Sequence, residues 1–132
     1  MEEETLHALV LAAREASARS YSPYSGFSVG AAVLTAKGNV YGGTNIENAS
    51  YGATVCAERV AILKAVSEGE RKIVAIAVHA DAAEVAVPCG MCLQVLSEFA
   101  EGDIPVILSG KGGTRPYRLS DLLPHPFNKD QL

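Results

Sequence analysis

Two short segments that carry all three cysteines place the strongest constraint on this chain. They read Cys56-x-Glu58 and Pro88-Cys89-x-x-Cys92. Residues three apart share one face of a helix, so a C-x-x-C pair at a helix start brings both sulfurs near one point. The positive end of a helix favours thiolate over thiol, and thiolates are good zinc ligands. Cys56, at the start of another predicted helix, can supply a third ligand.

The pattern indicates an open, catalytic zinc site. Three protein ligands leave one position of a tetrahedral zinc for water, whose pKa falls to about 7. Glu58 lies two residues beyond Cys56, close enough to reach that water without being a ligand. A carboxylate there can take a proton from water and pass protons to a ring nitrogen and to leaving ammonia. The zinc-deaminase signature is H-x-E…P-C-x-x-C, and here Cys56 stands at the His position.

The chain resembles the small, homotetrameric, zinc-dependent cytidine deaminases from about residue 21 to residue 127. Beyond the cysteine segments, the resemblance rests on residues 24–32 (YSGFSVGAA), 45–51 (NIENASY) and 122–127 (LLPHPF). It implies hydrolytic deamination of cytidine and deoxycytidine to uridine and deoxyuridine, in pyrimidine salvage, with one Zn²⁺ per subunit. In that reaction zinc-bound hydroxide attacks C4 of the base, and Glu58 is the proton shuttle.

The resemblance also implies which residues bind the nucleoside. Asn45 and Glu47 are expected to hold the ribose 3′-hydroxyl, Phe27 to pack on the pyrimidine, and the backbone N–H of Ala57 to approach the ring oxygen. Physical chemistry agrees with these roles, because an amide can donate, a carboxylate can only accept, and an aromatic face binds a planar base.

A homotetramer is expected from the same resemblance, with active sites completed by neighbouring subunits. Phe127, near the C-terminus, is expected to reach the pocket of a neighbouring subunit. Ala49 and Tyr51 are expected to touch the nucleoside across a subunit boundary.

Two positions depart from the family pattern P-C-G-A-C-R-Q, because Met91 replaces the Ala and Leu93 replaces the Arg. Zinc with three thiolates carries a formal charge of −1, which raises the pKa of a bound water unless a cation offsets it. With Leu93 in place of Arg, we expect Arg59 and the helix dipoles to supply that compensation.

Hydrophobic periodicity predicts one domain over residues 1–132. Helices are expected over residues 3–20, 56–68 and 89–99, with a short one over 119–123. Strands are expected over residues 29–33, 40–41, 73–78 and 104–108, with a hairpin turn at 37–39 and a glycine-rich turn at 110–114. The strand–helix alternation after residue 55 favours an α/β fold, as a three-layer α/β/α sandwich with a mixed central sheet.

Charge and composition limit the partners. The chain has 132 residues, a net charge of −4 and no basic run, which argues against a nucleic-acid partner. No apolar run approaches the roughly 20 residues that span a bilayer, and the N-terminus lacks the pattern of a signal peptide. An odd number of cysteines fits a reducing compartment, so a cytoplasmic location without membrane association is expected.

Three other interpretations remain open. The first is a closed structural zinc site, without enzyme activity, with His79 as fourth ligand. The second is a deaminase of cytosine-bearing antibiotics of the blasticidin type, although Phe27 and the Asn45-x-Glu47 segment favour a plain nucleoside. The third, a base-editing enzyme acting on RNA or DNA, is disfavoured by the acidic charge.

Overall fold

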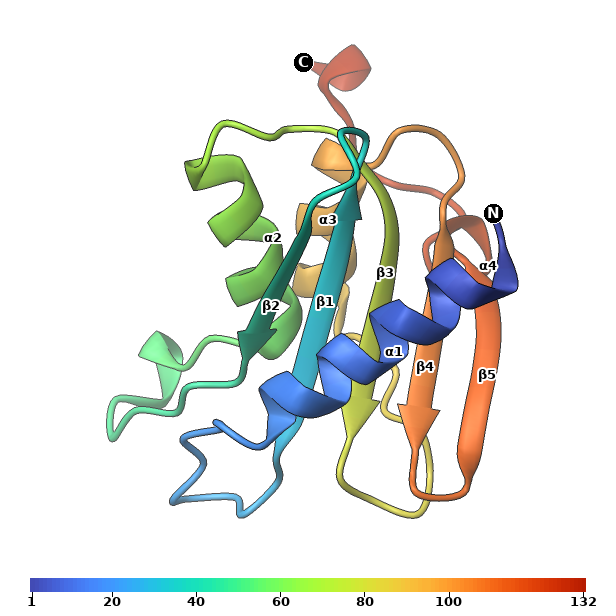
Figure 1. The fold of residues 1–132 in the computed structure, drawn as a ribbon. Helices are drawn as coiled ribbons and strands as arrows, with labels where there is room; N and C mark the ends of the chain where they lie inside the picture. Colours follow the sequence, from blue (N-terminus) through green and yellow to red (C-terminus); the bar gives the residue numbers. More distant parts are fainter.

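The computed structural model describes all 132 residues as a five-stranded sheet with helices on both faces (Figure 1). The strands are β1 (Val29–Thr35), β2 (Val40–Thr44), β3 (Ile73–Ala80), β4 (Pro105–Gly110) and β5 (Gly113–Arg118). The helices are α1 (Glu3–Ser17), α2 (Ala57–Ser67), α3 (Gly90–Phe99) and the short α4 (Leu119–Leu122). Two 3₁₀ turns complete the chain, at Tyr51–Ala53 and Lys129–Gln131.

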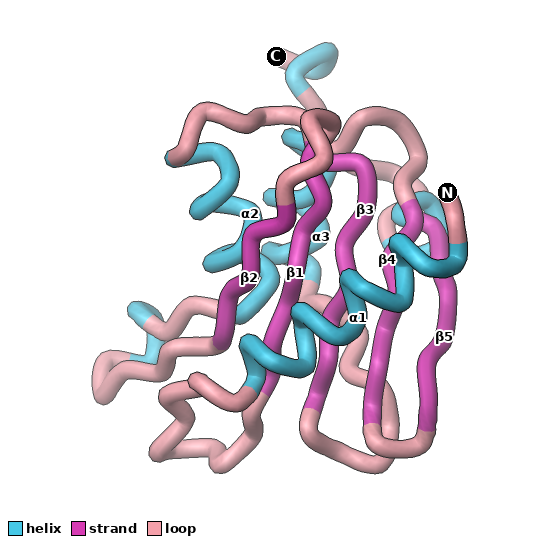
Figure 2. Tube along the Cα trace, in the orientation of Figure 1, coloured by secondary structure: helices cyan, strands magenta, loops and turns pink.

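The sheet has the strand order β2-β1-β3-β4-β5, and only β3 and β4 run parallel. Helix α1 covers one face, while α2 and α3 lie side by side on the other (Figures 1 and 2). This arrangement confirms the predicted three-layer sandwich with a mixed sheet. Because the β3–β4 connection must cross between parallel strands, it carries α3 back over the sheet.

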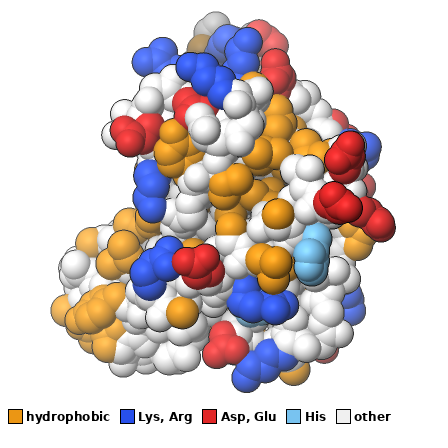
Figure 3. Space-filling model, in the orientation of Figure 1, with side chains coloured by type: hydrophobic (Ala, Val, Ile, Leu, Met, Phe, Trp, Pro, Cys, Tyr) orange, Lys and Arg blue, Asp and Glu red, His pale blue; other side chains and the backbone are white.

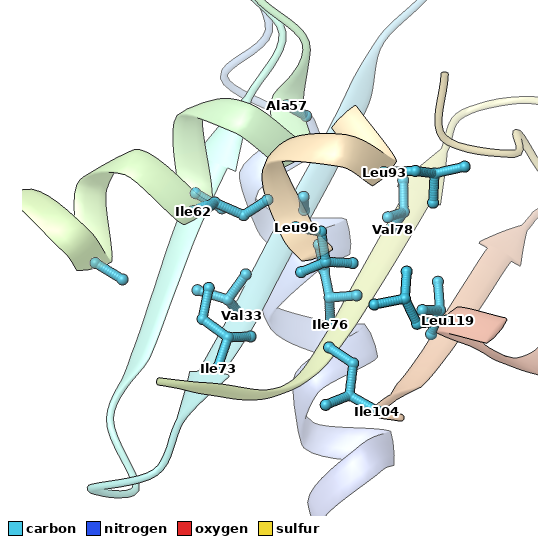
Figure 4. Close-up of a cluster of buried hydrophobic side chains, with 14 of the residues drawn as sticks. Val33, Ala57, Ile62, Ile73, Ile76, Val78, Leu93, Leu96, Ile104 and Leu119 are labelled. Atoms are coloured by element: carbon cyan, nitrogen blue, oxygen red, sulfur yellow. The ribbon is translucent and has the colours of Figure 1, made fainter. Parts of the chain in front are cut away.

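Two hydrophobic clusters hold the layers together. Alternation along β3 sends Ile76 and Val78 into the cluster beneath α2 and α3 (Figure 4), whereas Ala75 and Ala77 face α1. Successive strand residues point to opposite faces, so one strand serves both clusters. The small alanines on the α1 side allow that helix to lie close to the sheet.

Gly43 on β2 allows the first turns of α2 to pack directly on the sheet. A Cβ at Gly43 would lie 2.5 Å from the backbone nitrogen of Ala61 and 2.9 Å from the carbonyl oxygen of Ala57. Any larger residue there would push the helix outward. The glycine therefore helps to fix the start of α2, where Cys56 lies.

The predicted elements form, with changes at their edges. The first helix ends at Ser17 rather than at residue 20, because the chain then turns to pair Tyr21 with Ile46. The turn expected at residues 110–114 contains the start of β5, which was missed. That edge strand is almost wholly exposed and contains Pro116, so it lacks the apolar alternation that marks a strand.

Positive and negative side chains are interspersed on the face shown in Figure 3. None of the helices has the length and apolar character needed to cross a membrane.

Candidate metal centre and active site

The three cysteines meet where α2 and α3 begin. Cys56 is the N-cap of α2 and Cys89 is the N-cap of α3, and their carbonyl oxygens accept the first helical hydrogen bonds, from Val60 and Leu93. Cys92 lies in the first turn of α3. All three sulfurs lie within 4.8 Å of one another, and those of Cys89 and Cys92 are 3.4 Å apart. The fold thus gathers the sulfurs at two positive helix ends.

The sulfur cluster favours negative charge on Cys56. A hydrogen bond from the Cys92 thiol, and another from the Arg59 guanidinium, lower the pKa of Cys56 to about 5. The pKa of Cys92 is raised because it donates to Cys56 and is buried. Negative charge therefore forms easily on Cys56 and with difficulty on Cys92, as expected where a cation is needed to balance further charge.

The donor set fits zinc. Tetrahedral ligands at about 2.3 Å from a metal lie roughly 3.8 Å apart, a spacing compatible with these sulfurs. The Arg59 side chain packs against the cluster, with Nη2 3.6 Å from Cys56 Sγ. Its Nε is buried and has no hydrogen-bond partner. A guanidinium held so close to sulfur is favourable where the sulfurs carry negative charge, as metal-bound thiolates do.

His79 does not join this cluster. It follows Val78 on β3, so its side chain points to the α1 face, whereas the cysteines lie on the α2 and α3 side. There it is buried, and its Nδ1 lies 2.9 Å from the Ser109 hydroxyl oxygen. The closed site with His79 as fourth ligand is therefore wrong, because the sheet separates this histidine from the sulfurs.

Glu58 lies close enough to Cys56 and Cys92 for its charge to interact with theirs. It is only 6% exposed, in the first turn of α2. Burial, and to a smaller extent the negative charge of Cys56, raise the pKa of Glu58 to about 7. A carboxyl group with such a pKa can both accept and donate a proton near neutral pH.

A cavity of about 300 Å³ opens beside the sulfur cluster. It brings together residues from four separate parts of the chain: Ser25, Phe27, Val29, Asn45, Glu47, Thr54, Val55, Cys56, Ala57, Glu58, Ala86, Val87 and Cys89. Most of the lining residues are apolar, and the polar ones include Asn45, Glu47 and Glu58. Apolar walls with a few placed polar groups are typical of small-molecule sites.

The amide of Asn45 and the carboxylate of Glu47 are held by the loop that precedes β1. Asn45 accepts from the Val29 N–H at 3.0 Å and donates to the Phe27 carbonyl at 2.8 Å. Glu47 accepts from the backbone N–H of Tyr24 at 2.9 Å, and from both the N–H and the hydroxyl of Ser25. These bonds lower the pKa of Glu47, the Ser25 hydroxyl bond most of all, and keep it an acceptor.

Three of the expected binding residues do not line this cavity. Ala49 and Tyr51 lie on the projecting loop around the first 3₁₀ turn, where Tyr51 is 75% exposed and meets Tyr24 edge-on. Phe127 is 56% exposed, and its carbonyl accepts from the Gln94 amide at 2.6 Å. A single subunit does not bring these side chains together with Glu58.

The two departures from the family pattern lie in different surroundings. Met91 is exposed, whereas Leu93 is buried in the cluster with Val78 and Leu96 (Figure 4). The Leu93 side chain therefore serves the core beneath α3, and Arg59 is the cation that contacts the sulfurs.

Ser20 and Ser25 hold the binding residues, although no pattern in the sequence predicted this role for either serine. The Ser25 hydroxyl bonds Glu47, and the Ser20 hydroxyl bonds Asn45 at 2.5 Å. The only signal was position, because Ser25 lies within residues 24–32, the segment that carries Phe27, and Ser20 lies shortly before it. Side chains separated by more than 20 residues meet here through the fold alone.

Comparison with known proteins places the chain among zinc-binding deaminases. Residues 3–108 match the family described as the cytidine and deoxycytidylate deaminase zinc-binding region. The chain is 46% identical over 125 residues to the cytidine deaminase of Sporosarcina psychrophila, covering 94% of this chain and 92% of that protein. It is 47% identical over 125 residues to the cytidine deaminase of Halalkalibacterium halodurans, covering 94% and 95%.

Solved structures agree with the sequence matches. The crystal structure of cytidine deaminase from Burkholderia pseudomallei aligns with a TM-score of 0.87 and 42% identity, covering 96% of this chain and 100% of that one. The cytidine deaminase of Mycobacterium tuberculosis aligns with a TM-score of 0.82 and 40% identity, covering 93% and 97%. The similarity spans the whole sandwich, and both cysteine segments lie within the matched residues.

Proposed function

Because this chain belongs to the cytidine and deoxycytidylate deaminase family, we propose that it removes the 4-amino group of free cytidine and deoxycytidine by hydrolysis. The chain is a zinc-dependent hydrolytic enzyme. Water replaces the amino group, so the products are uridine or deoxyuridine and ammonia. The proposal rests on one observation: the three cysteine sulfurs lie together, and two of these cysteines, Cys56 and Cys89, line a nucleoside-sized cavity with the buried Glu58.

Zinc is the cofactor, and Cys56, Cys89 and Cys92 would hold it. When bound, the metal would act as a Lewis acid and make water a nucleophile at neutral pH. No His, Asp or Glu side chain joins the three sulfurs as a further metal ligand. With only these three ligands, one position on the metal would be left for water, as a catalytic site requires.

Glu58 moves the protons. It accepts a proton from the attacking water, protonates N3 of the base, and then helps to protonate the amino group that leaves as ammonia. A pKa near 7 suits this exchange, because the carboxyl group gains and loses a proton at little cost. Burial keeps the group out of bulk water and beside the reacting atoms.

The rest of the cavity binds the nucleoside. Phe27 packs on the pyrimidine, and the Asn45 amide and the Glu47 carboxylate hold the ribose 3′-hydroxyl. Ala57 is the first residue of α2, where a backbone N–H has no intrahelical partner and can donate to the ring oxygen. The hydrogen bonds already made by Asn45 and Glu47 support this role, because they fix both groups before substrate binds.

The active form is a homotetramer whose sites are completed by neighbours. The exposure of Tyr51 and Phe127 supports this, since large apolar side chains outside the core are available to a second subunit. Ala49 and Tyr51 would touch the nucleoside, and Phe127 would enter a neighbouring pocket. The protein would act in the cytoplasm, where three cysteines remain thiols. Sedimentation equilibrium of the wild type and Phe127→Ala tests the assembly, and a monomeric wild type refutes it.

Loss of absorbance as cytidine is converted to uridine tests the function directly. The wild type should deaminate cytidine and deoxycytidine, and a chelator should abolish activity until zinc is restored. Glu58→Gln should keep zinc and lose activity by at least about 10³-fold, because the proton transfers assigned to Glu58 fail. A zinc-loaded wild type that is idle on both nucleosides but active on blasticidin would assign the antibiotic reaction instead. A zinc-loaded wild type that is inactive on cytidine, deoxycytidine and blasticidin would be a non-enzymatic zinc protein.

A further inference from the structure

We propose that Ser20 is a positioning residue that aims the Asn45 amide at the substrate, an inference that rests on the nucleoside site proposed above. Ser20 lies in the connection between α1 and β1 and is not among the residues that line the cavity. Its hydroxyl oxygen lies 2.5 Å from Asn45 Oδ1, although 25 residues separate the two in sequence. The contact joins the end of the first helix to the substrate pocket.

The hydrogen bonds of Asn45 show why this contact matters. Its amide oxygen has two acceptor positions, and the Ser20 hydroxyl and the Val29 N–H occupy both. Its amide nitrogen has two N–H groups, of which one donates to the Phe27 carbonyl. A single N–H is left for the cavity. The amide can therefore meet a substrate hydroxyl only as a donor, opposite the acceptor Glu47.

Ser20 is itself held firmly. Its backbone N–H donates to the Ser17 carbonyl at 3.2 Å, at the end of α1. The next residue, Tyr21, donates to the Asn45 carbonyl at 3.1 Å and accepts from the Glu47 N–H at 2.8 Å. Residues 20–21 thus run beside residues 45–47, and the Ser20 hydroxyl stays opposite the amide before any substrate arrives.

Removing the Ser20 hydroxyl would leave a nearly buried amide oxygen with one acceptor position unfilled. Asn45 is only 9% exposed, so bulk water cannot freely replace the bond. The oxygen could then compete for the substrate hydroxyl, and the remaining N–H would be a weaker donor because hydrogen bonds at the two ends of an amide polarise one another. Both effects weaken binding of the ribose hydroxyl and leave the chemistry at Glu58 intact.

The test compares Ser20→Ala with the wild type on cytidine and on 3′-deoxycytidine, which lacks the hydroxyl. The ratio of kcat/KM for cytidine to that for 3′-deoxycytidine should fall by about three- to tenfold, mainly through KM for cytidine. Kinetics on 3′-deoxycytidine should change little. Ser20→Thr keeps the hydroxyl and should keep the ratio. Ser22→Ala is the matched control, since its hydroxyl lies 3.1 Å from Ser20 Oγ without bonding Asn45.

Each outcome decides the proposal. A folded Ser20→Ala enzyme with the wild-type ratio overturns it, and so does an equal loss on both substrates, which would show a role in stability alone. If Ser20→Ala does not fold, Ser20→Cys takes its place, because a thiol is a weak donor of similar size. A fall in the same ratio that is smaller than the fall expected for Ser20→Ala then supports the proposal, and an unchanged ratio overturns it. A wild type inactive on cytidine refutes the proposed function instead, before any variant is made.

Discussion

The guanidinium of Arg59 lies 3.6 Å from the sulfur of Cys56 at the start of the same helix. The helix backbone fixes this pairing, because residues three apart share a face. A cation thus accompanies the sulfur cluster from within one turn of α2. The family pattern P-C-G-A-C-R-Q has an arginine directly after its second cysteine. This chain has the buried Leu93 at that position. Arg59 is therefore the side-chain cation beside the thiolates.

Arg59→Gln should weaken zinc binding by about tenfold, because partners that contact metal ligands contribute on this scale. Competition with a chromogenic chelator measures the change. The acidic limb of the pH–rate profile should also move to higher pH, since the thiolates lose the cation that offsets their charge. Arg71→Gln, on a residue distant from α2's first turn, controls for loss of one charge. An unchanged acidic limb in Arg59→Gln would refute this role for Arg59.

Glu58→Gln should stabilise the zinc-free protein at alkaline pH. The pKa of Glu58 is about 7 in the folded chain, above its ordinary value of 4.5, so the folded state binds the proton more tightly. Stability from this group is fully present below pH 4.5 and is lost as pH rises through 7. The free energy of unfolding of the variant should therefore exceed that of the wild type by roughly 3 kcal/mol at pH 8.

Urea unfolding of both zinc-free proteins at pH 5 and pH 8 measures that difference. The gap should shrink toward zero at pH 5, where Glu58 is largely protonated in the folded state. Comparison of the two proteins cancels most of the effect of the cysteines, which both retain. A difference in the free energy of unfolding that does not change with pH would show that burial does not raise the pKa of Glu58.

Gly43→Ala should destabilise the fold by about 3 kcal/mol, because the new methyl group would meet the α2 backbone at 2.5 Å. The displacement would also move Cys56, so zinc content should fall with stability. Gly52→Ala is the control, since a Cβ there meets nothing within 4 Å. Thermal unfolding and metal analysis of the two variants check the prediction, which fails if they behave alike.

Cys89→Ala and His79→Ala should differ in metal content. The first removes one of three sulfurs and should leave little zinc after gel filtration, whereas the second should retain one zinc per subunit. His79→Ala should lose some stability through its bond to Ser109, by about 1 kcal/mol. Zinc loss in His79→Ala, measured by atomic absorption in the folded fraction, would restore this histidine as a ligand.

Local sequence patterns were sufficient to predict most of the helices and strands of the fold. Apolar spacing predicted α2, α3, β3 and β4 to within a few residues, because each buries one face or both faces in the core. Apolar spacing did not predict β5, because its residues are mostly exposed and its pairing with β4 is made by the backbone. It also extended α1 beyond Ser17, because the pairing of Tyr21 with Ile46 is a contact between distant segments.

The sequence by itself determined the metal-binding chemistry, since the spacing of Cys89 and Cys92 and the step from Cys56 to Glu58 are properties of single helix turns. Only the tertiary structure decided that the two helix starts meet, that His79 lies across the sheet, and that Ser20 reaches Asn45. The physical reason is distance along the chain. A helix turn is set by neighbouring residues, whereas contacts between remote segments depend on how the layers pack.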